Sequence, residues 1–285
     1  MNALKLADLT AGLYLVATPI GNLRDITLRA LDVLKQADYI ACEDKRVTGK
    51  LLQSYDIENN GRLLVYNDHS KAGDRQHIAA LIGQGCSVAL VSDAGMPMIS
   101  DPGYKLVRDC IDLGLSVTSV PGANAPLAAL QLSGLPSDRF MFAGFLPSKD
   151  QARFEIFNEL KSVEATLVFY ETAPRLQASL EAILATLGDR PVAVVREITK
   201  MFEEARRDTV SRLIAHYKEK GAPKGEIVLL IAGAEKTDYS DAQIEAMLRD
   251  ALETMSSKDA SAFVAEQTGL PRKQLYNLVL SMKDA

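Results

Sequence analysis

Two carboxylates and a bent backbone make residues 92–103 a candidate site for chemistry. Asp93 and Asp101 stand near the two ends of this segment, and glycine and proline residues bend the chain between them. Residues 86–91, just before it, form a short apolar run typical of a buried strand. Ligands of open α/β sheets bind outside the carboxyl ends of such strands. The alternative is a connection whose acids cap turns or the next helix; capping is favoured for Asp101 alone, whereas the density of glycine and proline favours a site for the whole segment.

Three other polar loops follow predicted strands in the same half of the chain. They comprise residues 18–25, 42–46 and 121–125, after strands expected at 13–18, 39–42 and 116–120. Strands that alternate with helices in this way predict an α/β fold with a mainly parallel sheet. Because the carboxyl ends of parallel strands meet at one edge, the four loops are expected to converge on one cleft. Taken singly, each loop has the composition of an ordinary turn or cap.

A second α/β pattern begins at Pro121. Strands are expected at 140–145, 166–170, 192–196 and 227–232, with helices between them. Residues 203–209 are polar enough for an added antiparallel strand at the edge of this sheet. The sequence therefore predicts two α/β domains, residues 12–120 and 121–235.

Residues 240–285 differ from both domains and contain three short helical patterns. Ser257 is expected to cap the middle helix, and Gly269-Leu270-Pro271 separates it from the last. Two helices joined by so short a turn predict a helix-turn-helix-like tail. A plain helical bundle that binds no nucleic acid is the alternative, and the pattern leaves both open.

The composition disfavours several classes of function. No Gly-x-Gly-x-x-Gly follows the first strand, and no P-loop or α/β-hydrolase elbow occurs. The three cysteines and three histidines are scattered without metal-ligand spacing, so no metal site is predicted. No apolar run has the length of a membrane span, and residues 1–10 lack the features of a signal peptide, which predicts a cytoplasmic protein without a membrane partner.

The net charge of −5 does not indicate nucleic-acid binding by bulk electrostatics. Residues 196–224 nevertheless hold eight Lys and Arg against five acids, an excess of three positive charges. This basic segment could contact phosphates or form a solvated face of mixed charge. Charge alone does not decide between the two.

Long motifs spread over nearly the whole chain resemble those of one family. They are residues 17–27, 41–44, 92–95, 100–103, 120–122, 144–147, 169–171, 196–200 and 224–226. With these motifs the chain resembles the ribosomal RNA small-subunit methyltransferase I family, a branch of the tetrapyrrole methylase superfamily. The resemblance implies S-adenosylmethionine-dependent methylation of a cytidine ribose 2′-hydroxyl in the decoding region of 16S ribosomal RNA, within the small subunit. It also implies a two-domain fold with the cofactor in the cleft, and a homodimer.

The resemblance further implies which residues line the cofactor. They are Pro19, Asp93, Ala94, Gly95, Ile99, Ser100, Gly122 and Ala123, with Phe145 and Leu146 from the second domain. The chain departs from the family pattern at Lys45 and Met96, each of which replaces a threonine. Met96 removes a hydroxyl beside the expected cofactor, whereas Gly95 and Pro97 keep the bend of the loop.

Methyl transfer to a ribose needs the methyl group and the acceptor oxygen held in line. Because the hydroxyl is a poor acid, a base or a group that stabilises the alkoxide should help. The catalytic candidates are Asp44 and Lys200, followed by Glu43 and Arg46, and then by Glu171 and Glu197. The alternative is that Glu43 with Arg46, or Glu197 with Lys200, form ion pairs near the domain interface.

Two other functions would use the same features. A tetrapyrrole methyltransferase of the precorrin type would use the cofactor cleft on a small molecule, and the basic segment and the tail argue against it. A non-enzymatic nucleic-acid-binding regulator would use the tail on a degenerate body, and the intact cleft loops argue against that.

Overall fold

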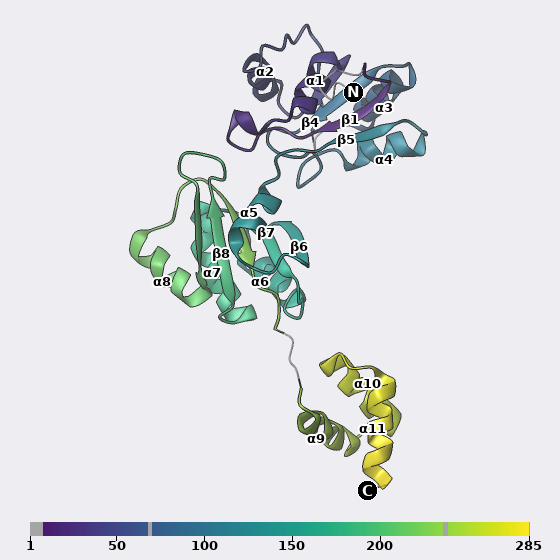
Figure 1. The fold of residues 1–285 in the computed structure, drawn as a ribbon, viewed down its shortest axis with the longest axis vertical. Helices are drawn as coiled ribbons and strands as arrows, with labels where there is room; N and C mark the ends of the chain where they lie inside the picture. Colours follow the sequence, from purple (N-terminus) through teal and green to yellow (C-terminus); the bar gives the residue numbers. More distant parts are fainter. Residues whose placement is uncertain (1–7, 68–69, 236–238, 285) are drawn as a thin grey trace, which may run out of the picture. The chain divides into compact units, whose positions relative to one another are not determined.

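The computed structural model describes residues 8–67, 70–235 and 239–284, so His69 lies outside the described residues. The chain divides into two compact units, Met1–Gly233 and Ala234–Ala285, which are described separately. The larger unit contains two five-stranded sheets, and the smaller one is helical (Figure 1).

The first sheet is parallel throughout and has the strand order β3-β2-β4-β1-β5. Its strands are β1 (Gly12–Val16), β2 (Tyr39–Cys42), β3 (Leu63–Val65), β4 (Ser87–Val91) and β5 (Val117–Val120). The helices between them are η1 (Leu23–Asp25), α1 (Leu28–Gln36), α2 (Lys45–Gln53), α3 (Ala72–Gly83) and α4 (Tyr104–Asp112). The predicted parallel sheet is confirmed.

Apolar residues fill both faces of this sheet, as expected when helices cover each side. Successive residues of a strand point to opposite faces. Accordingly Ala89 and Val91 of β4 pack with α1, whereas Val88 and Leu90 pack with α3 and α4. Every residue of β4 is buried, so the loop that follows it leaves from the centre of the sheet.

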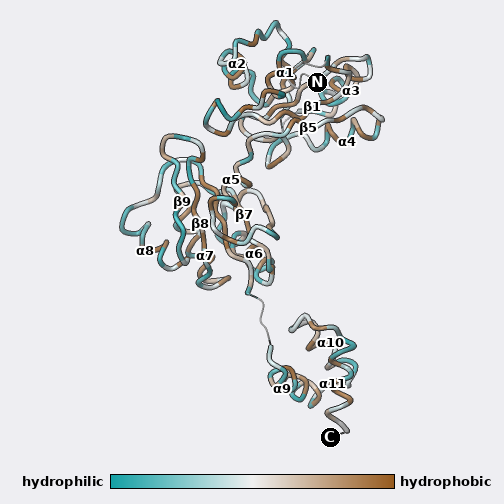
Figure 2. Tube along the Cα trace, in the orientation of Figure 1, coloured by the Kyte–Doolittle hydropathy of each residue, from teal (hydrophilic) through white to brown (hydrophobic). Residues whose placement is uncertain are grey.

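The second sheet is mixed and has the strand order β6-β7-β10-β8-β9. Its strands are β6 (Phe140–Phe145), β7 (Thr166–Thr172), β8 (Pro191–Arg196), β9 (Glu204–Thr209) and β10 (Glu226–Ile231). Only β6 and β7 pair in parallel; the other neighbours are antiparallel. The predicted polar edge strand is confirmed as β9, which Figure 2 shows as largely hydrophilic beside the hydrophobic β8.

Helices lie on both faces of the second sheet. They are α5 (Ala125–Ser133), α6 (Asp150–Glu159), η2 (Ala173–Arg175), α7 (Leu176–Leu187) and α8 (Val210–Lys220). Residues of α6, α7 and α8 share one core with the strands, and residues of α5 share the core on the other face. Asn124 caps α5 by accepting a hydrogen bond from the Leu127 N–H, which fixes the start of that helix beside the loop after β5.

The small unit consists of α9 (Asp241–Leu252), α10 (Ser257–Thr268) and α11 (Arg272–Asp284). It has its own core, which includes Leu248, Val264 and Leu275. Gly269, with a φ of 68°, ends α10. The prediction that Ser257 caps α10 is wrong: Ser256 is the cap and accepts from the Asp259 N–H, because the helix begins one residue earlier than its apolar pattern.

Among the helices of the described residues, none combines the length and the apolar character that a membrane crossing requires.

Candidate functional site

A cavity of about 450 Å³ opens at the carboxyl edge of the first sheet. Loops after β1, β2, β4 and β5 contribute to its wall, together with residues of the second sheet. Its lining comprises Ile20, Glu43, residues 93–96, Ile99, Asp101, Asn124, Ala125, Phe145, residues 170–172, Ile198 and residues 225–228. The volume is typical of a small-molecule site. The four loops that the sequence predicts to converge do line one cavity.

Backbone hydrogen bonds join the loops after β1 and β4. The Thr18 N–H donates to the Gly95 carbonyl at 2.9 Å, and the Gly95 N–H donates back to the Thr18 carbonyl at 3.1 Å. The Thr18 hydroxyl also donates to the Ser92 carbonyl at 3.2 Å. Gly95 has a φ of 84°, which a side chain would strain. The bend anticipated at Gly95 therefore brings two loops together at the cavity.

The loop 92–103 holds strained backbone beside the cavity. Met98 has a φ of 73° and Ser100 a φ of 65°, values that residues with side chains rarely adopt. At Gly103 a Cβ atom would lie 2.7 Å from Cγ of Met98, so the loop folds tightly on itself. Such strain concentrates at functional sites.

Carboxylates dominate the polar lining of the cavity. Five acids line it, namely Glu43, Asp93, Asp101, Glu171 and Glu226, and the described lining residues include no Lys or Arg. Glu171 is buried and accepts from Ser179 Oγ at 2.6 Å and from Arg175 Nε at 2.8 Å, so its charge is balanced within the wall. Lys200 likewise balances the charge of Glu226. Glu43, Asp93 and Asp101 suit a ligand that carries positive charge.

Burial and the nearby negative charge of Asp44 raise the pKa of Asp93 above its ordinary value. The Asp93 N–H donates to Oε1 of Glu43 at 3.3 Å. These contacts place three acidic residues, Glu43, Asp44 and Asp93, close together where β2 and β4 end.

Aromatic rings form the wall that the second sheet contributes. Phe145 and Tyr170 lie with ring centroids 5.0 Å apart, and Phe142 meets Tyr170 edge-on at 5.1 Å. Burial, with the negative charges of Asp101 and Glu226, raises the pKa of Tyr170 to about 12. The tyrosine hydroxyl is therefore protonated at neutral pH and can donate a hydrogen bond.

Half of the residues expected to line the cofactor lie in the cavity wall. These are Asp93, Ala94, Gly95, Ile99 and Phe145. The other five stand behind or beside the wall: Pro19 precedes Ile20, Ser100 follows Ile99, Gly122 packs against Ala17, Ala123 lies near Gly95, and Leu146 is buried in the core of the second sheet. Met96 also lines the cavity, whereas Lys45 is the exposed first residue of α2.

Asp44 and Arg46 form an ion pair at the start of α2. Asp44 is the N-cap of that helix and accepts from the Arg46 N–H at 2.7 Å, while Arg46 Nη2 lies 2.6 Å from Asp44 Oδ2. The hydrogen bonds from Arg46 lower the pKa of Asp44 to about 2. Arg46 thus pairs with Asp44, whereas the alternative had paired it with Glu43; Glu43 lines the cavity.

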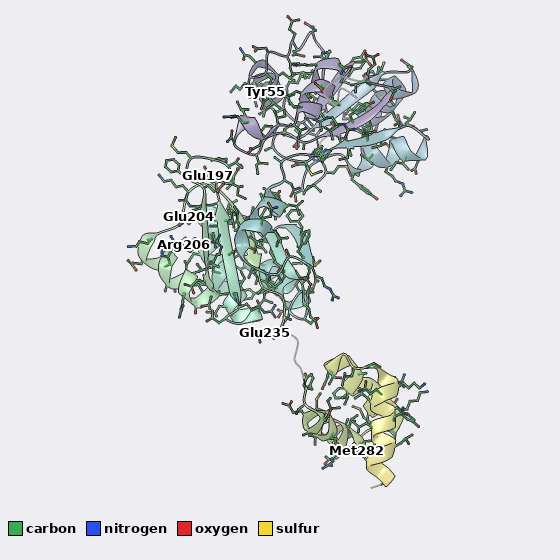
Figure 3. The ribbon with its side chains drawn as sticks, viewed as in Figure 1. Tyr55, Glu197, Glu204, Arg206, Glu235 and Met282 are labelled. Atoms are coloured by element: carbon green, nitrogen blue, oxygen red, sulfur yellow. The ribbon has the colours of Figure 1, made fainter. Side chains whose placement is uncertain are left out.

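Lys200 joins two carboxylates of the second sheet. Its Nζ lies 3.1 Å from Oε1 of Glu197 and 2.7 Å from Oε2 of Glu226. Burial disfavours the charge of Lys200, but the hydrogen bonds that it donates to Glu226 and Glu197 outweigh burial and raise its pKa. The ion pair foreseen between Glu197 and Lys200 is present. Glu197 is labelled in Figure 3.

Several lining residues were not predicted as site residues. Tyr170, Ile198, Gly225 and Glu226 all fall within motifs on which the family resemblance rests, so the motifs carried a usable signal. Asp101 was interpreted as a cap residue, and Asn124 belongs to the loop 121–125, which was expected to reach the cleft. Asn124 does cap α5, but Asp101 is not the N-cap of α4; Gly103 is, and Asp101 lines the cavity.

Most cations of the basic segment 196–224 are neutralised. Six of its eight Lys and Arg form ion pairs with Asp or Glu. For example, Arg196 and Arg206 both pair with Glu204; Arg206 and Glu204 are labelled in Figure 3. This favours the solvated face of mixed charge over a phosphate-binding patch. Within the described residues no group of three His, Cys, Asp or Glu could hold a metal ion.

The fold and the sequence match known methyltransferases. Residues 12–214 match the family Tetrapyrrole (Corrin/Porphyrin) Methylases, and residues 238–283 match the RsmI C-terminal HTH domain. A protein of Erythrobacter litoralis named ribosomal RNA small subunit methyltransferase I is 54% identical over 96% of each chain. The chain belongs to the ribosomal RNA small subunit methyltransferase I family.

Further members of this methyltransferase family match over nearly their full length. The relative in Mesorhizobium japonicum is 47% identical over 97% of this chain and 94% of its own. The relative in Escherichia coli O157:H7 is 43% identical over 97% of this chain and 98% of its own.

Solved structures with the same fold are more distant in sequence. A diphthine synthase aligns with a TM-score of 0.59 at 16% identity, over 77% of this chain and 89% of its own. A uroporphyrin-III-C-methyltransferase from Thermus thermophilus aligns with a TM-score of 0.52 at 22% identity, over 78% and 94%. These similarities support the tetrapyrrole methylase fold predicted from the sequence.

Proposed function

We propose that this protein transfers a methyl group from S-adenosylmethionine to the ribose 2′-hydroxyl of a cytidine in the decoding region of 16S ribosomal RNA. The observation that carries the proposal is the full-length similarity to proteins named ribosomal RNA small subunit methyltransferase I. The tetrapyrrole and regulator alternatives have no comparable support, since the tail also matches the domain of that family.

The lining of the cavity fits the proposed cofactor. S-Adenosylmethionine supplies an activated methyl group on a positive sulfonium, and it also carries an ammonium group. Asp93, Glu43 and Asp101 complement these positive charges. Phe145, Ile99 and Ile20 offer apolar contacts to an adenine ring. The bend at Gly95 places Asp93 and Ala94 in the cavity wall. Ala94, Ser100, Pro19, Gly122, Ala123 and Leu146 complete the proposed cofactor site.

Glu43, Asp44, Arg46 and Lys200 remain the proposed catalytic group, with roles that the contacts distinguish. Glu43 lines the cavity, which makes it the best placed to accept the proton of a ribose hydroxyl. Asp44 is a weak base because of its low pKa, so we assign it and Arg46 to positioning of the Glu43 loop. Lys200 pairs with two carboxylates, so we assign it to positioning of Glu226 at the cavity wall.

The proposal extends to the organisation of the molecule. Residues 12–120 and 121–235 act as the two halves of the cofactor cleft, and residues 240–285 dock the 16S RNA of the small subunit. The protein works in the cytoplasm as a homodimer. The exposed Phe140 and Met141 on β6, an edge strand, support an interface with a second copy.

Methyl-labelled cofactor offered with three acceptors tests the proposal. Undermethylated small subunits, protein-free 16S RNA and a precorrin are incubated separately with the protein. The proposal predicts label in the RNA of the subunits and none in the precorrin. Label in the precorrin alone would establish the tetrapyrrole alternative, and cofactor-independent RNA binding without transfer would establish the regulator.

A further inference from the structure

The loop between β8 and β9, residues 197–203, presents large apolar side chains to solvent. Met201 is 90% exposed and Phe202 is 65% exposed. Ile198, near the start of the same loop, is buried and lines the cavity. Within four residues the loop therefore runs from the cavity wall to an exposed end, and we call Met201 and Phe202 the apolar tip.

Hydrogen bonds and ion pairs hold the base of this loop. Lys200 bridges Glu197 and Glu226, as described above. The Thr199 N–H donates to Oε2 of Glu203 at 2.7 Å, and the Glu203 N–H donates to the Lys200 carbonyl at 3.2 Å. Because the base is fixed, the apolar tip is presented outward on an ordered loop.

The backbone of the loop is strained. Glu197 has a φ of 49° and Thr199 a φ of 64°, and a positive φ at a β-branched residue is a clear outlier. The buried hydroxyl of Thr199 has no hydrogen-bond partner within the part of the chain that the structure describes. A simple turn between antiparallel strands needs neither the strained backbone nor the unpaired buried hydroxyl. Both cost free energy, and such costly features concentrate at functional sites.

The loop after β1 packs directly against this strained loop. A Cβ atom at Gly21 would lie 2.5 Å from Cγ of Lys200 and 3.0 Å from the Ile198 carbonyl oxygen. Leu23, two residues after Gly21, is 46% exposed. The next residue, Arg24, is also exposed. The Tyr55 hydroxyl (Figure 3) donates to the Leu23 carbonyl and fixes this segment. An exposed cation, Arg24, thus lies three residues from the glycine that packs against the loop of the apolar tip.

We propose that Phe202 stacks on an unpaired nucleobase beside the target ribose, with Met201 covering its edge and Arg24 contacting a backbone phosphate. This inference rests on the function proposed above and deepens it. A cavity of about 450 Å³ holds one small molecule, so the bases next to an entering ribose must lie at the rim. Aromatic side chains stack on unpaired RNA bases regardless of sequence, and Arg binds phosphate. A ribosomal protein seated on the tip is the competing occupant.

A tryptophan reporter distinguishes the two occupants. The chain contains no tryptophan, so Phe202→Trp introduces its single tryptophan at the tip, which can be excited apart from the nine tyrosines. Binding of undermethylated small subunits should quench its emission, after correction for absorbance and subtraction of the signal of the same subunits with the wild-type protein, because a stacked base quenches indole fluorescence. A blue shift without quenching would mean burial against protein and would overturn the proposal, as would an unchanged spectrum under saturating subunits.

Methylation kinetics of matched variants provides a second test of base stacking by Phe202. Phe202→Ala should raise KM for subunits by about tenfold to a hundredfold, the equivalent of one lost base stack. Phe202→Tyr should restore KM, since its ring stacks equally well. Cofactor affinity should be unchanged in both. The control is Leu113→Ala, which removes an equally exposed side chain, 65%, at the end of α4 outside the cavity lining.

Three results would overturn the proposal while leaving the proposed function intact. They are wild-type KM in Phe202→Ala, an equal loss in Leu113→Ala, and no rescue by Phe202→Tyr. Failure of the proposed function is distinct, because the unmodified protein would then transfer no methyl group to subunits.

Discussion

Asp93 is the residue on which the charge complementarity of the cavity can be tested most simply. Asp93→Asn keeps the shape of the side chain and removes its charge. Since a hydrogen bond to a charged group contributes about 1.5–3 kcal/mol, we expect S-adenosylmethionine to bind about tenfold to a hundredfold more weakly, measured by calorimetry. Asp112→Asn is the control, because Asp112 pairs with Arg108 on α4 outside the cavity lining. Equal affinity of Asp93→Asn and the wild type would contradict this role.

The raised pKa of Asp93 adds a pH dependence to the same prediction. The positive cofactor needs the ionised carboxylate, so its affinity should fall as the pH drops through the raised pKa, at a higher pH than for an ordinary aspartate. Asp44→Asn removes one of the two causes of the shift and should move this fall to lower pH, while asparagine still caps α2. Asp93→Asn should abolish the dependence. If the cofactor affinity of Asp93→Asn still falls at low pH, the pH dependence belongs to another group.

Glu43 is the acid whose position best suits a general base. Glu43→Gln keeps the hydrogen-bonding shape but cannot take a proton, so kcat for methyl transfer should fall by about 10²–10⁴-fold while the cofactor still binds. Asp44→Asn should lower kcat much less, because the ion pair with Arg46 already makes Asp44 a poor base. If Asp44→Asn loses more activity than Glu43→Gln, the two roles are reversed. Single-turnover methylation of subunits measures both.

At the scale of elements, Gly21 tests the packing of the loop after β1 against residues 197–203. Gly21→Ala places a Cβ 2.5 Å from the Lys200 side chain and 3.0 Å from a backbone oxygen, so we expect a loss of about 1–3 kcal/mol in the free energy of unfolding. Gly49→Ala is the matched control in α2, where no described atom outside the adjacent residues and the nearby backbone of the helix lies within 4 Å of the added Cβ. It should stabilise by about 0.5–1 kcal/mol. Urea unfolding of both variants measures these free energies. Equal stability of Gly21→Ala and Gly49→Ala would show that the contact between the two loops is absent in solution.

The elements themselves were largely predictable from local sequence. Thr27 is of a residue type that caps helices, and it caps α1 by accepting from the Ala30 N–H. The polar composition of residues 203–209 indicated an edge strand, and β9 is one. The order and direction of the strands in the second sheet were not predictable, because periodicity describes each strand but not its neighbours. For that reason Tyr170, Ile198 and Glu226 were missed as cavity residues.

Side-chain partners were predicted less well than backbone loops. The convergence of four loops follows from parallel topology, and it is present. Which carboxylate meets which cation depends on a few ångströms of loop geometry, so Arg46 was paired with the wrong neighbour in the alternative reading of its role. The sequence left the role of the basic segment open, because a count of charges does not reveal that its cations pair internally.

At the scale of the molecule, the tail can be separated from the catalytic body. Residues 234–285 form a compact unit with its own core. A protein that ends at Gly233 should therefore bind the cofactor with unchanged affinity and bind small subunits at least about tenfold more weakly, since one of two linked contact regions is lost. Calorimetry and subunit sedimentation measure the two affinities. Undiminished subunit binding by the shortened protein would reject RNA docking by the tail.

The central claim is that this enzyme methylates a ribose hydroxyl of 16S RNA, and the site of the label tests it most directly. A 2′-O-methyl group blocks alkaline cleavage of the adjacent phosphodiester. After transfer from methyl-labelled cofactor to undermethylated subunits, alkaline digestion of the 16S RNA should leave the label in an alkali-resistant dinucleotide that begins with cytidine. Label released as a mononucleotide would mean methylation of a base and would contradict the account.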